Sequence, residues 1–361
     1  MTAQIREDAA ALAEADRLDA AGRHTEAIDV MAGAVKRGCV TSMTRIGARI
    51  MVGDRAPMLG EQGAGLIEDA ANAGGGEAAA LMAVLRGAGV YRTADWGAAL
   101  DWLTASAERG FGLAQGALAA LAGAEAPDGK GQIDWRAMRD QAAAEDWSVA
   151  PDPKTLSGDP QIRAYSGFVT PAAAAWMIGR ARGRLRRAEI YNAQARAAQA
   201  HENRTNSAAN FSLIDADLVQ IAVQRRIAAA AGAPFQHLEA PAVLNYAPGE
   251  RFAEHFDFID PRTPGYEALI ARDGQRAATM LVYLNADYEG GETAFPRLHI
   301  RFRGEACGAL YFANVLEGEK ADVRTVHAGE PTASGEKWVM SQFIRSRPAL
   351  PGASGGGFFQ P

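Results

Sequence analysis

The apolar residues of this chain follow a different pattern in each half. Up to about residue 125, alanine and glycine dominate, and apolar residues recur at helical spacing in the segments 27–37, 63–73 and 99–109. From about residue 158 to 347, short runs of β-branched and aromatic residues are separated by glycine and proline. The pattern predicts an α+β protein in which a helical half precedes a half built of strands.

The helical half contains an internal repeat. Three glycines spaced by 36 residues (74 − 38 and 110 − 74) mark successive units: Gly38, Gly74 and Gly110. Glycine there allows the left-handed conformation with which a helix ends and the chain reverses. Two sets of core positions align under the same shift: Met31, Ile67 and Leu103, and Ile46, Met82 and Leu118. Each unit is predicted to form two helices around the glycine turn, and stacked units of this length form an α-helical solenoid.

These patterns divide the chain into four segments. Residues 1–125 form the helical repeat domain and 158–347 the strand-rich domain. Residues 126–157 are rich in proline and glycine, which predicts a linker, with one short helix over 133–144. The glycine-rich end, 348–361, is expected to be a flexible tail.

Composition narrows the functional classes. The net charge of −6 argues against nucleic acid as a partner, because binding phosphates requires a basic surface. There are only two cysteines, which favours a reducing compartment. The N-terminus has no apolar signal region, and no apolar run is long enough to span a membrane. We therefore expect a cytoplasmic protein that binds neither membrane nor nucleic acid.

The strand-rich half holds a pattern typical of a metal site. His255 and Asp257 lie in a predicted strand, where residues two apart point to the same face. His327 lies 70 residues after Asp257 (327 − 257), in an extended run before a glycine. Each histidine alone is more often structural. Together the three form a two-histidine, one-carboxylate set, which binds iron(II) and leaves positions for a 2-oxo acid and O₂.

Lys337 follows His327 by ten residues (337 − 327), at the start of a strongly strand-forming segment. A buried lysine supplies a compact charge for the remote carboxylate of the 2-oxo acid. We expect His327 and Lys337 to lie on neighbouring antiparallel strands joined by a short turn at 331–335.

Residues 158–347 resemble the prolyl 4-hydroxylase α-subunit-like family of 2-oxoglutarate- and iron(II)-dependent dioxygenases. Four motifs occur in the family's order: RTNSAANFSL at 204–213, the tyrosine-to-HxD segment at 244–257, RAATMLVYLNADYEGGETAFP at 276–296, and the distal segment 309–337. Within the helical half, residues 98–123 resemble a Sel1-type repeat, a relative of the tetratricopeptide repeat.

The resemblance implies a double-stranded β-helix (jelly roll) with flanking helices. It implies that His255, Asp257 and His327 bind iron, that Lys337 binds 2-oxoglutarate, and that three further residues line the cosubstrate pocket: Tyr246, Tyr283 and Thr279. It also implies hydroxylation of a C–H bond coupled to conversion of 2-oxoglutarate and O₂ to succinate and CO₂. Ascorbate is a further expected cofactor.

Several alternatives stay open at this point. The substrate is either a prolyl residue in a protein or peptide recruited by the repeats, or a small amino acid or metabolite, with the repeats only capping the catalytic domain. A catalytically inactive scaffold is a third interpretation, and a homodimer is compatible with each. Arg204 contacts either substrate or a structural partner. Trp338 either faces substrate or packs in the core.

Overall fold

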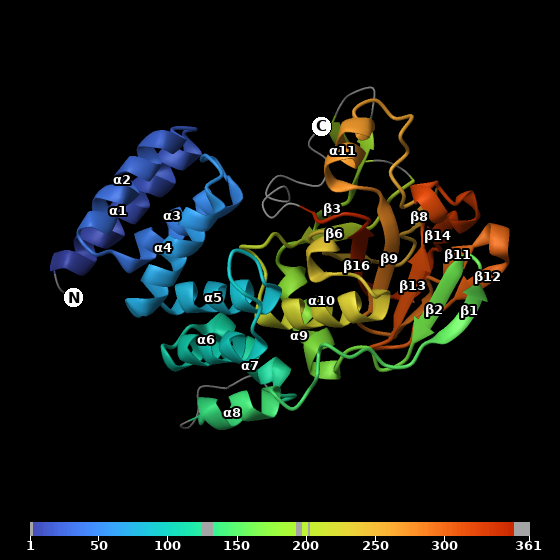
Figure 1. Cartoon of the computed structure of the whole chain (residues 1–361), viewed down its shortest axis with the longest axis horizontal. Coiled ribbons are helices and arrows are strands. Elements are labelled where there is room, and N and C mark those ends of the chain that lie inside the picture. Colours follow the sequence, from blue (N-terminus) through green and yellow to red (C-terminus); the bar gives the residue numbers. More distant parts are fainter. Residues whose placement is uncertain (1–2, 125–132, 193–196, 201–202, 350–361) are drawn as a thin grey trace.

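The computed structural model describes residues 3–124, 133–192, 197–200 and 203–349. The helical half lies on one side of the molecule and the strand-rich half on the other, with helices α9 (Pro171–Arg182) and α10 (Leu218–Ala231) between them (Figure 1). No helix among the described residues is both long and apolar enough to cross a membrane. The arrangement is the predicted α+β organisation.

The first half is a regular array of paired helices. An additional helix, α1 (Ala3–Ala20), precedes three pairs. The first helices of the pairs begin at residues 24, 60 and 96, and the second helices begin at 40, 76 and 112, so the 36-residue period holds in the structure (60 − 24 and 76 − 40). The pairs are α2 (His24–Lys36) with α3 (Val40–Val52), α4 (Gly60–Asn72) with α5 (Gly76–Ala88), and α6 (Trp96–Glu108) with α7 (Gly112–Leu121).

The repeat works as the sequence predicted. The three turn glycines have positive φ angles of 91°, 95° and 80°, which residues with a Cβ rarely adopt: Gly38, Gly74 and Gly110. Both sets of aligned apolar positions are buried between the helices. These observations confirm the solenoid, whereas its assignment to the Sel1 type stays a prediction.

The described part of the expected linker is more structured than proline and glycine suggest. It contains the predicted short helix, α8 (Trp135–Ala142), but also strand β1 (Lys154–Gly158), which pairs with β2 (Gln161–Tyr165) at the edge of the larger sheet. The buried Arg226 of α10 donates hydrogen bonds to the carbonyls of Asp146 and Val149, and its guanidinium lies over the Trp147 ring. This segment is therefore attached to the catalytic half. Residues 125–132 of the linker and 350–361 of the expected tail lie outside the described residues.

The second half contains two facing sheets. The larger has eight strands in the order β1-β2-β13-β9-β16-β7-β6-β3, and the smaller has four in the order β12-β11-β14-β8. The remaining strands of the larger sheet are β3 (Arg186–Arg187), β6 (Ser207–Asn210), β7 (Ala242–Tyr246), β9 (Arg276–Tyr283), β13 (Ala309–Ala313) and β16 (Lys337–Arg345). Those of the smaller sheet are β8 (Phe252–His255), β11 (Thr293–Phe295), β12 (Ile300–Phe302) and β14 (His327–Gly329).

From β7 onward the chain alternates between the sheets. β7, β9, β13 and β16 lie in the larger sheet, while β8, β11–β12 and β14 lie in the smaller one. This alternation is the double-stranded β-helix. Two short ladders complete it, β4 (Glu189–Asn192) with β5 (Ala197–Ala200) and β10 (Tyr288–Gly290) with β15 (Thr332–Gly335), and helix α11 (Tyr266–Asp273) connects β8 to β9. Between the sheets lies a small apolar core that includes Phe295, Phe312 and Val339.

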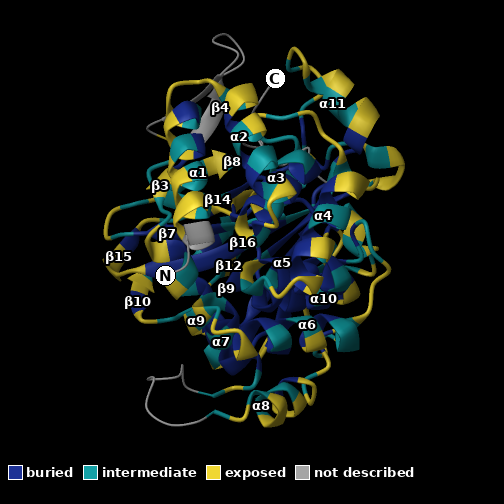
Figure 2. Cartoon of the chain, turned by 90° about the vertical axis from the view of Figure 1, so that its left-hand side faces the viewer, coloured by how far each residue is buried: buried dark blue, intermediate teal, exposed yellow. Residues whose placement is uncertain are grey.

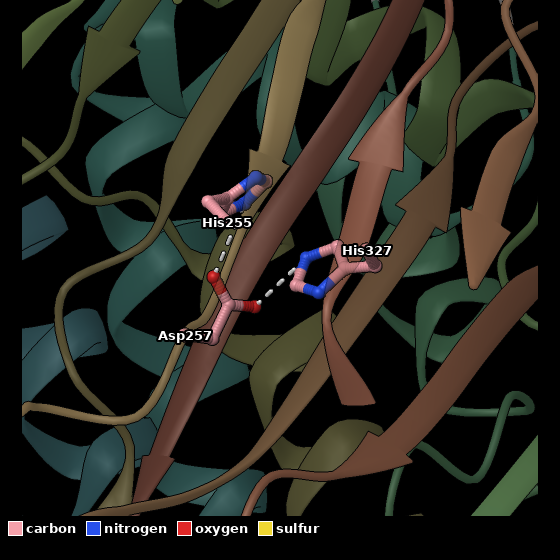
Figure 3. A group of neighbouring side chains, drawn as sticks. All are labelled: His255, Asp257 and His327. Carbon is pink, nitrogen blue, oxygen red and sulfur yellow. Dashed lines mark ion pairs between the residues drawn. The ribbon is translucent and has the colours of Figure 1, made fainter. Parts of the chain in front are cut away.

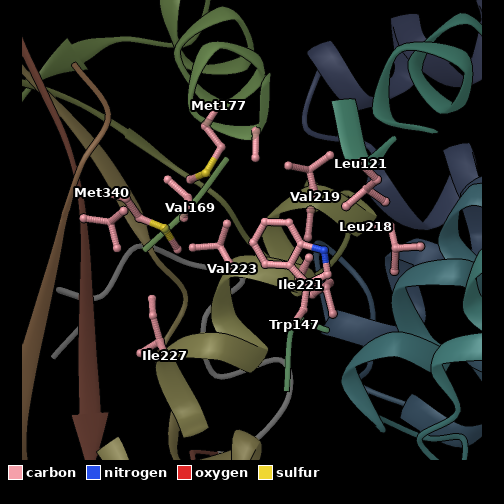
Figure 4. Close-up of a cluster of buried hydrophobic side chains, with 14 of the residues drawn as sticks. Leu121, Trp147, Val169, Met177, Leu218, Val219, Ile221, Val223, Ile227 and Met340 are labelled. Carbon is pink, nitrogen blue, oxygen red and sulfur yellow. The ribbon is translucent and has the colours of Figure 1, made fainter. Parts of the chain in front are cut away.

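One hydrophobic cluster extends across the boundary between the two halves. It joins array residues such as Leu121 to α10 residues such as Ile221 and then to Met340 on the larger sheet (Figure 4). Buried residues are concentrated around α5 and α10 (Figure 2). Because α10 is buried on both the sheet side and the array side, the array is fixed to the catalytic half by a shared core.

The contact between array and catalytic half also requires a glycine. A Cβ at Gly116 in α7 would lie 2.3 Å from the Trp176 ring of α9. That ring is held by a hydrogen bond from its Nε1 to Asp217. The two helices can therefore approach each other only if α7 has no side chain at this position.

We predict opposite effects for two glycine-to-alanine substitutions inside array helices. Gly116→Ala should lower the free energy of unfolding by about 1–3 kcal/mol, because the methyl group overlaps a fixed ring. Gly65→Ala, in α4 with nothing within 4 Å of its Cβ, should raise it by up to about 1 kcal/mol through helix propensity. Urea denaturation measures both. Equal effects of the two substitutions would contradict the proposed close contact.

Candidate metal centre

Two histidines and one aspartate meet between the two sheets. The Nε2 atom of His255 lies 3.5 Å from Oδ1 of Asp257, and Nε2 of His327 lies 3.4 Å from Oδ2 of the same carboxylate. Both imidazoles point toward Asp257 (Figure 3). One ligand atom from each of these three residues lies within 4.8 Å of the others. Among the histidine, cysteine, aspartate and glutamate side chains of the described residues, these three form the group that could hold a metal ion.

The pairing of β8 with β14 places the two histidines. His255 ends β8, His327 begins β14, and the two residues are direct partners in the antiparallel ladder. The expectation that Asp257 continues the same strand is wrong, because β8 ends at His255 and Asp257 lies in the bend that follows. The carboxylate reaches the site because Thr279, on β9 of the opposite sheet, donates a 2.7 Å hydrogen bond to Oδ2.

Backbone carbonyls fix the orientation of both imidazoles. Nδ1 of His255 lies 2.8 Å from the carbonyl oxygen of Ala253, and Nδ1 of His327 lies 3.0 Å from that of Thr325. A carbonyl only accepts, so each Nδ1 carries the proton and each Nε2 presents its lone pair to the centre. Metal-binding histidines are commonly oriented in this way.

The protonation states also suit a cation. Burial alone raises the pKa of Asp257, but the neighbouring histidines and the Thr279 hydroxyl outweigh it and hold this pKa well below its usual range. Burial lowers the pKa of His327 to about 4, although Asp257 opposes the change. An ionised carboxylate and neutral imidazole nitrogens are the donor set of non-haem iron(II) sites, in which the other coordination positions stay open.

Lys337 is buried at the start of β16 in the larger sheet. Its Nζ donates a 2.7 Å hydrogen bond to the carbonyl of Gly291 and lies 5.3 Å and 5.5 Å from the ring centres of Tyr246 and Tyr283. Burial lowers the pKa of Lys337 to about 8, although Glu292 acts to raise it. Among the described residues Nζ donates to one acceptor, the Gly291 carbonyl, so the ammonium group has protons left to donate to an incoming carboxylate.

The expected adjacency of His327 and Lys337 is wrong. β14 lies in the smaller sheet between β11 and β8, whereas β16 lies in the larger sheet between β9 and β7. Residues 332–335 are not a turn but strand β15, which pairs with β10 while the chain crosses between sheets. The histidine and the lysine therefore lie on opposite walls of the same jelly roll.

The residues expected in the cosubstrate pocket have different surroundings. Tyr246 is the ladder partner of Lys337, and burial raises its pKa to about 12. The hydroxyl of Tyr283 pairs at 2.9 Å with the hydroxyl of Thr293. Both tyrosine rings lie beside the Lys337 ammonium group. Thr279 instead contacts the metal-site carboxylate, which gives it a positioning role.

The two residues considered as substrate contacts lie in different places. Arg204 forms a bridge with Phe252 of β8, and its guanidinium lies 4.6 Å from the centre of the Phe252 ring, which itself stacks on His255. Trp338 lies on the opposite face of β16 from Lys337, in the core beneath the helices, and its Nε1 donates to Glu336. The structure thus brings Arg204 beside the metal centre and makes Trp338 a packing residue.

Some supporting residues were not identified from the sequence. The Gln275 amide forms two hydrogen bonds with the backbone of Ile259, two residues beyond Asp257. Asn314 donates to Thr279. Asn314 falls within the recognised distal motif, but its residue type alone did not indicate the contact with Thr279. No feature of the sequence indicated that Gln275 bonds to the backbone of Ile259.

Comparison with known proteins agrees with this geometry. Residues 241–345 match the model of the 2OG-Fe(II) oxygenase superfamily. A putative prolyl 4-hydroxylase of Acanthamoeba polyphaga mimivirus is 35% identical over 115 residues, which cover 32% of this chain and 48% of the viral protein. Prolyl 4-hydroxylase 1 of Arabidopsis thaliana is 28% identical over 213 residues, covering 54% and 72%. The matched part of this chain thus spans about half the length of the viral relative and 72% of the length of the plant relative.

Solved structures also match about half of the chain. A viral collagen prolyl hydroxylase from Paramecium Bursaria Chlorella virus-1, in its 2-oxoglutarate complex, matches with a TM-score of 0.40 and 24% identity, covering 51% of this chain and 95% of the viral one. A prolyl-4-hydroxylase from Pseudomonas putida matches with a TM-score of 0.36 and 18% identity, covering 51% and 92%.

We predict that binding of 2-oxoglutarate weakens at alkaline pH. With a pKa of about 8, Lys337 loses its charge as the pH rises, so the dissociation constant should increase about tenfold per pH unit above that value. Lys337→Arg should bind more weakly because of its shape, but without this pH dependence, since arginine stays protonated. Anaerobic calorimetry with the manganese(II)-loaded protein measures both. A flat profile for the unmodified protein would contradict the role of Lys337.

Proposed function

We propose that this chain, whose second half is a 2OG-Fe(II) oxygenase domain resembling those of prolyl 4-hydroxylases, hydroxylates a prolyl residue in a protein or peptide. The reaction consumes 2-oxoglutarate and O₂ and releases succinate and CO₂. The observation that carries the proposal is the convergence of His255, Asp257 and His327 in a jelly roll whose opposite wall holds a buried lysine. Neither feature alone would indicate this chemistry.

Each group has a distinct part in the proposed reaction. His255, Asp257 and His327 would hold iron(II), which supplies the activation of O₂ and of the bound 2-oxo acid. Lys337 binds the remote carboxylate of 2-oxoglutarate. Tyr246 and Tyr283 shield that contact from water, which strengthens it. Arg204, beside Phe252 and His255, is placed where it can orient a substrate backbone.

The prolyl substrate is supported by the relatives, which are described as prolyl 4-hydroxylases. The alternative substrate, a free amino acid or metabolite, would not need to be recruited by the array. The hydrophobic core shared by the two halves supports this alternative, because it is expected of an array that only caps the catalytic domain. An inactive scaffold is disfavoured, because the three metal ligands and Lys337 occur together. Ascorbate as a cofactor, the cytoplasmic location and a homodimer stay predictions.

We further propose that the array receives the protein or peptide substrate. Two hollows of about 270 and 250 Å³ lie along the array, one lined mainly by α1, α3 and α5 and the other between α5–α7 and residues 214–218 of the catalytic half. Glu77, Leu81 and Ile214 line both. The two hollows therefore adjoin each other, and the second reaches the catalytic half; together we call them the groove.

The central test is succinate formation by anaerobically iron-loaded protein on exposure to O₂. We expect iron-dependent turnover that His255→Ala abolishes, and mass spectrometry should find one added oxygen on proline in some member of a panel of prolyl peptides. The matched control His299→Ala changes an exposed histidine that does not belong to the metal-site group and should retain activity. Hydroxylation of a free amino acid but of no peptide would replace the prolyl-peptide proposal by the small-molecule one.

The groove proposal predicts an effect that depends on substrate length. Glu77→Lys reverses an exposed charge at the junction of the two hollows, so it should raise KM several-fold for long prolyl peptides and leave KM for short ones unchanged. Asp69→Lys, the same change on α4 outside both hollows, is the control. Equal KM values for all three proteins would contradict recruitment by the groove.

A further inference from the structure

We infer that Asn314 is a positioning residue that connects two of the three metal ligands through separate hydrogen-bond paths. Its side chain reaches Asp257 and its backbone reaches His327. The inference rests on the metal site of the proposed function but not on the identity of the substrate.

The first path runs through Thr279. Nδ2 of Asn314 lies 2.9 Å from Oγ1 of Thr279, and this hydroxyl lies 2.7 Å from Oδ2 of Asp257. Thr279 donates its single hydroxyl proton to Oδ2 of the Asp257 carboxylate. Thr279 must then accept from Asn314, which fixes the orientation of the asparagine amide. The carboxylate is held by an ordered, one-directional relay.

The second path runs along the backbone toward His327. The amide of Asp322 donates to the carbonyl of Asn314 at 3.1 Å, and both the amide and the hydroxyl of Thr325 donate to the carbonyl of Asp322 at 3.1 and 2.8 Å. The carbonyl of Thr325 then accepts the Nδ1 proton of His327 at 3.0 Å. The tautomer and ring orientation of His327 therefore depend on a turn whose base is Asn314.

Asn314 itself is placed by the larger sheet. It directly follows β13, and its amide donates to the carbonyl of Ala277 on the β9 side at 2.8 Å. The side chains of Asn314, Thr279, Asp322 and Thr325 are all at least 97% buried. Water cannot readily replace a hydrogen-bonding group that is lost from these paths. A displacement of Asn314 is therefore expected to displace both Asp257 and His327.

One feature separates a positioning role from ordinary packing. Oδ1 of Asn314 is buried and has no hydrogen-bond partner among the described residues. A buried carbonyl without a partner is destabilising by about 1–3 kcal/mol. An apolar side chain of the same shape would avoid this cost, so packing alone does not explain an asparagine here. The Nδ2 donor directed at Thr279 does explain it.

The test compares iron(II) affinity with stability. Asn314→Leu and Thr279→Val are nearly isosteric and remove one link each, and we expect each to weaken iron(II) binding by roughly 10- to 100-fold in anaerobic titrations. The melting temperature of Asn314→Leu should be unchanged or higher, because the unpaired Oδ1 is gone. Thr279→Ser keeps the hydroxyl and should restore affinity to within about twofold of the unmodified protein.

Two further measurements distinguish the relay from general disturbance. The buried Thr104 of α6 bonds only within its own helix, so Thr104→Val is the matched control and should leave iron(II) affinity unchanged. The absorption bands of the cobalt(II)-loaded protein should shift in Thr279→Val and Asn314→Leu but not in Thr104→Val or Thr279→Ser. If Asn314→Leu does not fold, the Thr279 pair decides the question.

The outcomes are separable. If the unmodified protein does not bind iron(II), the proposed function itself fails. If it binds and both relay variants bind equally well, the relay is overturned while the proposed function stands. An affinity loss in Thr279→Val that Thr279→Ser fails to restore would also overturn it, because the hydroxyl would then not be the active element.

Discussion

The register between β8 and β14 is the constraint on which the site depends. It sets His255 directly opposite His327 in the smaller sheet, and the carbonyls two residues before each histidine turn both Nε2 atoms inward. A shift of one residue would reverse the faces of every side chain on the strand. The larger sheet then faces this pair of histidines. From that sheet Thr279 donates to the Asp257 carboxylate, and the buried Lys337 lies on the same sheet.

The layer behind the larger sheet gives this register its support. α10 is buried on nearly all sides, as is typical of a helix enclosed by other elements, and its buried residues include Gln220, Gln224 and Arg226. It packs on the sheet through residues such as Val223 and on the array through Leu218 (Figure 4). The buried Arg226 then holds the connecting segment by hydrogen bonds to the carbonyls of Asp146 and Val149. Sheet, helix layer and array are therefore one packed unit.

Local patterns in the sequence were sufficient to predict the repeat and to single out the three side chains that meet at the candidate metal centre. The 36-residue period indicated where the helices pair, because each turn requires a glycine at one place. The HxD pair with a distant histidine matches a known donor set.

The pairing of strands that are distant in the sequence could not be predicted from local patterns. Nothing in residues 327–337 shows that β14 and β16 belong to different sheets, or that β1 in the expected linker pairs with β2. Trp338 was predictable in hindsight, since it neighbours Lys337 on a strand and must face the other way. The hydrogen bond between Asn314 and Thr279 joins residues 35 positions apart. No periodic pattern in the sequence predicts this contact.

The shared core has a consequence for how such a chain can change over evolutionary time. In most multidomain proteins a linker is a point where modules can be exchanged, because each side keeps its own core. In this chain, separation of the array from the catalytic half would expose the face of α10 that packs on the array. It would also expose the ring of Trp176, which Gly116 of α7 now covers. Exchange of the array for an unrelated module would leave a large apolar surface open to aggregation. The two halves are therefore expected to be inherited as a single unit, which changes by substitution within that unit rather than by recombination at the boundary between its halves.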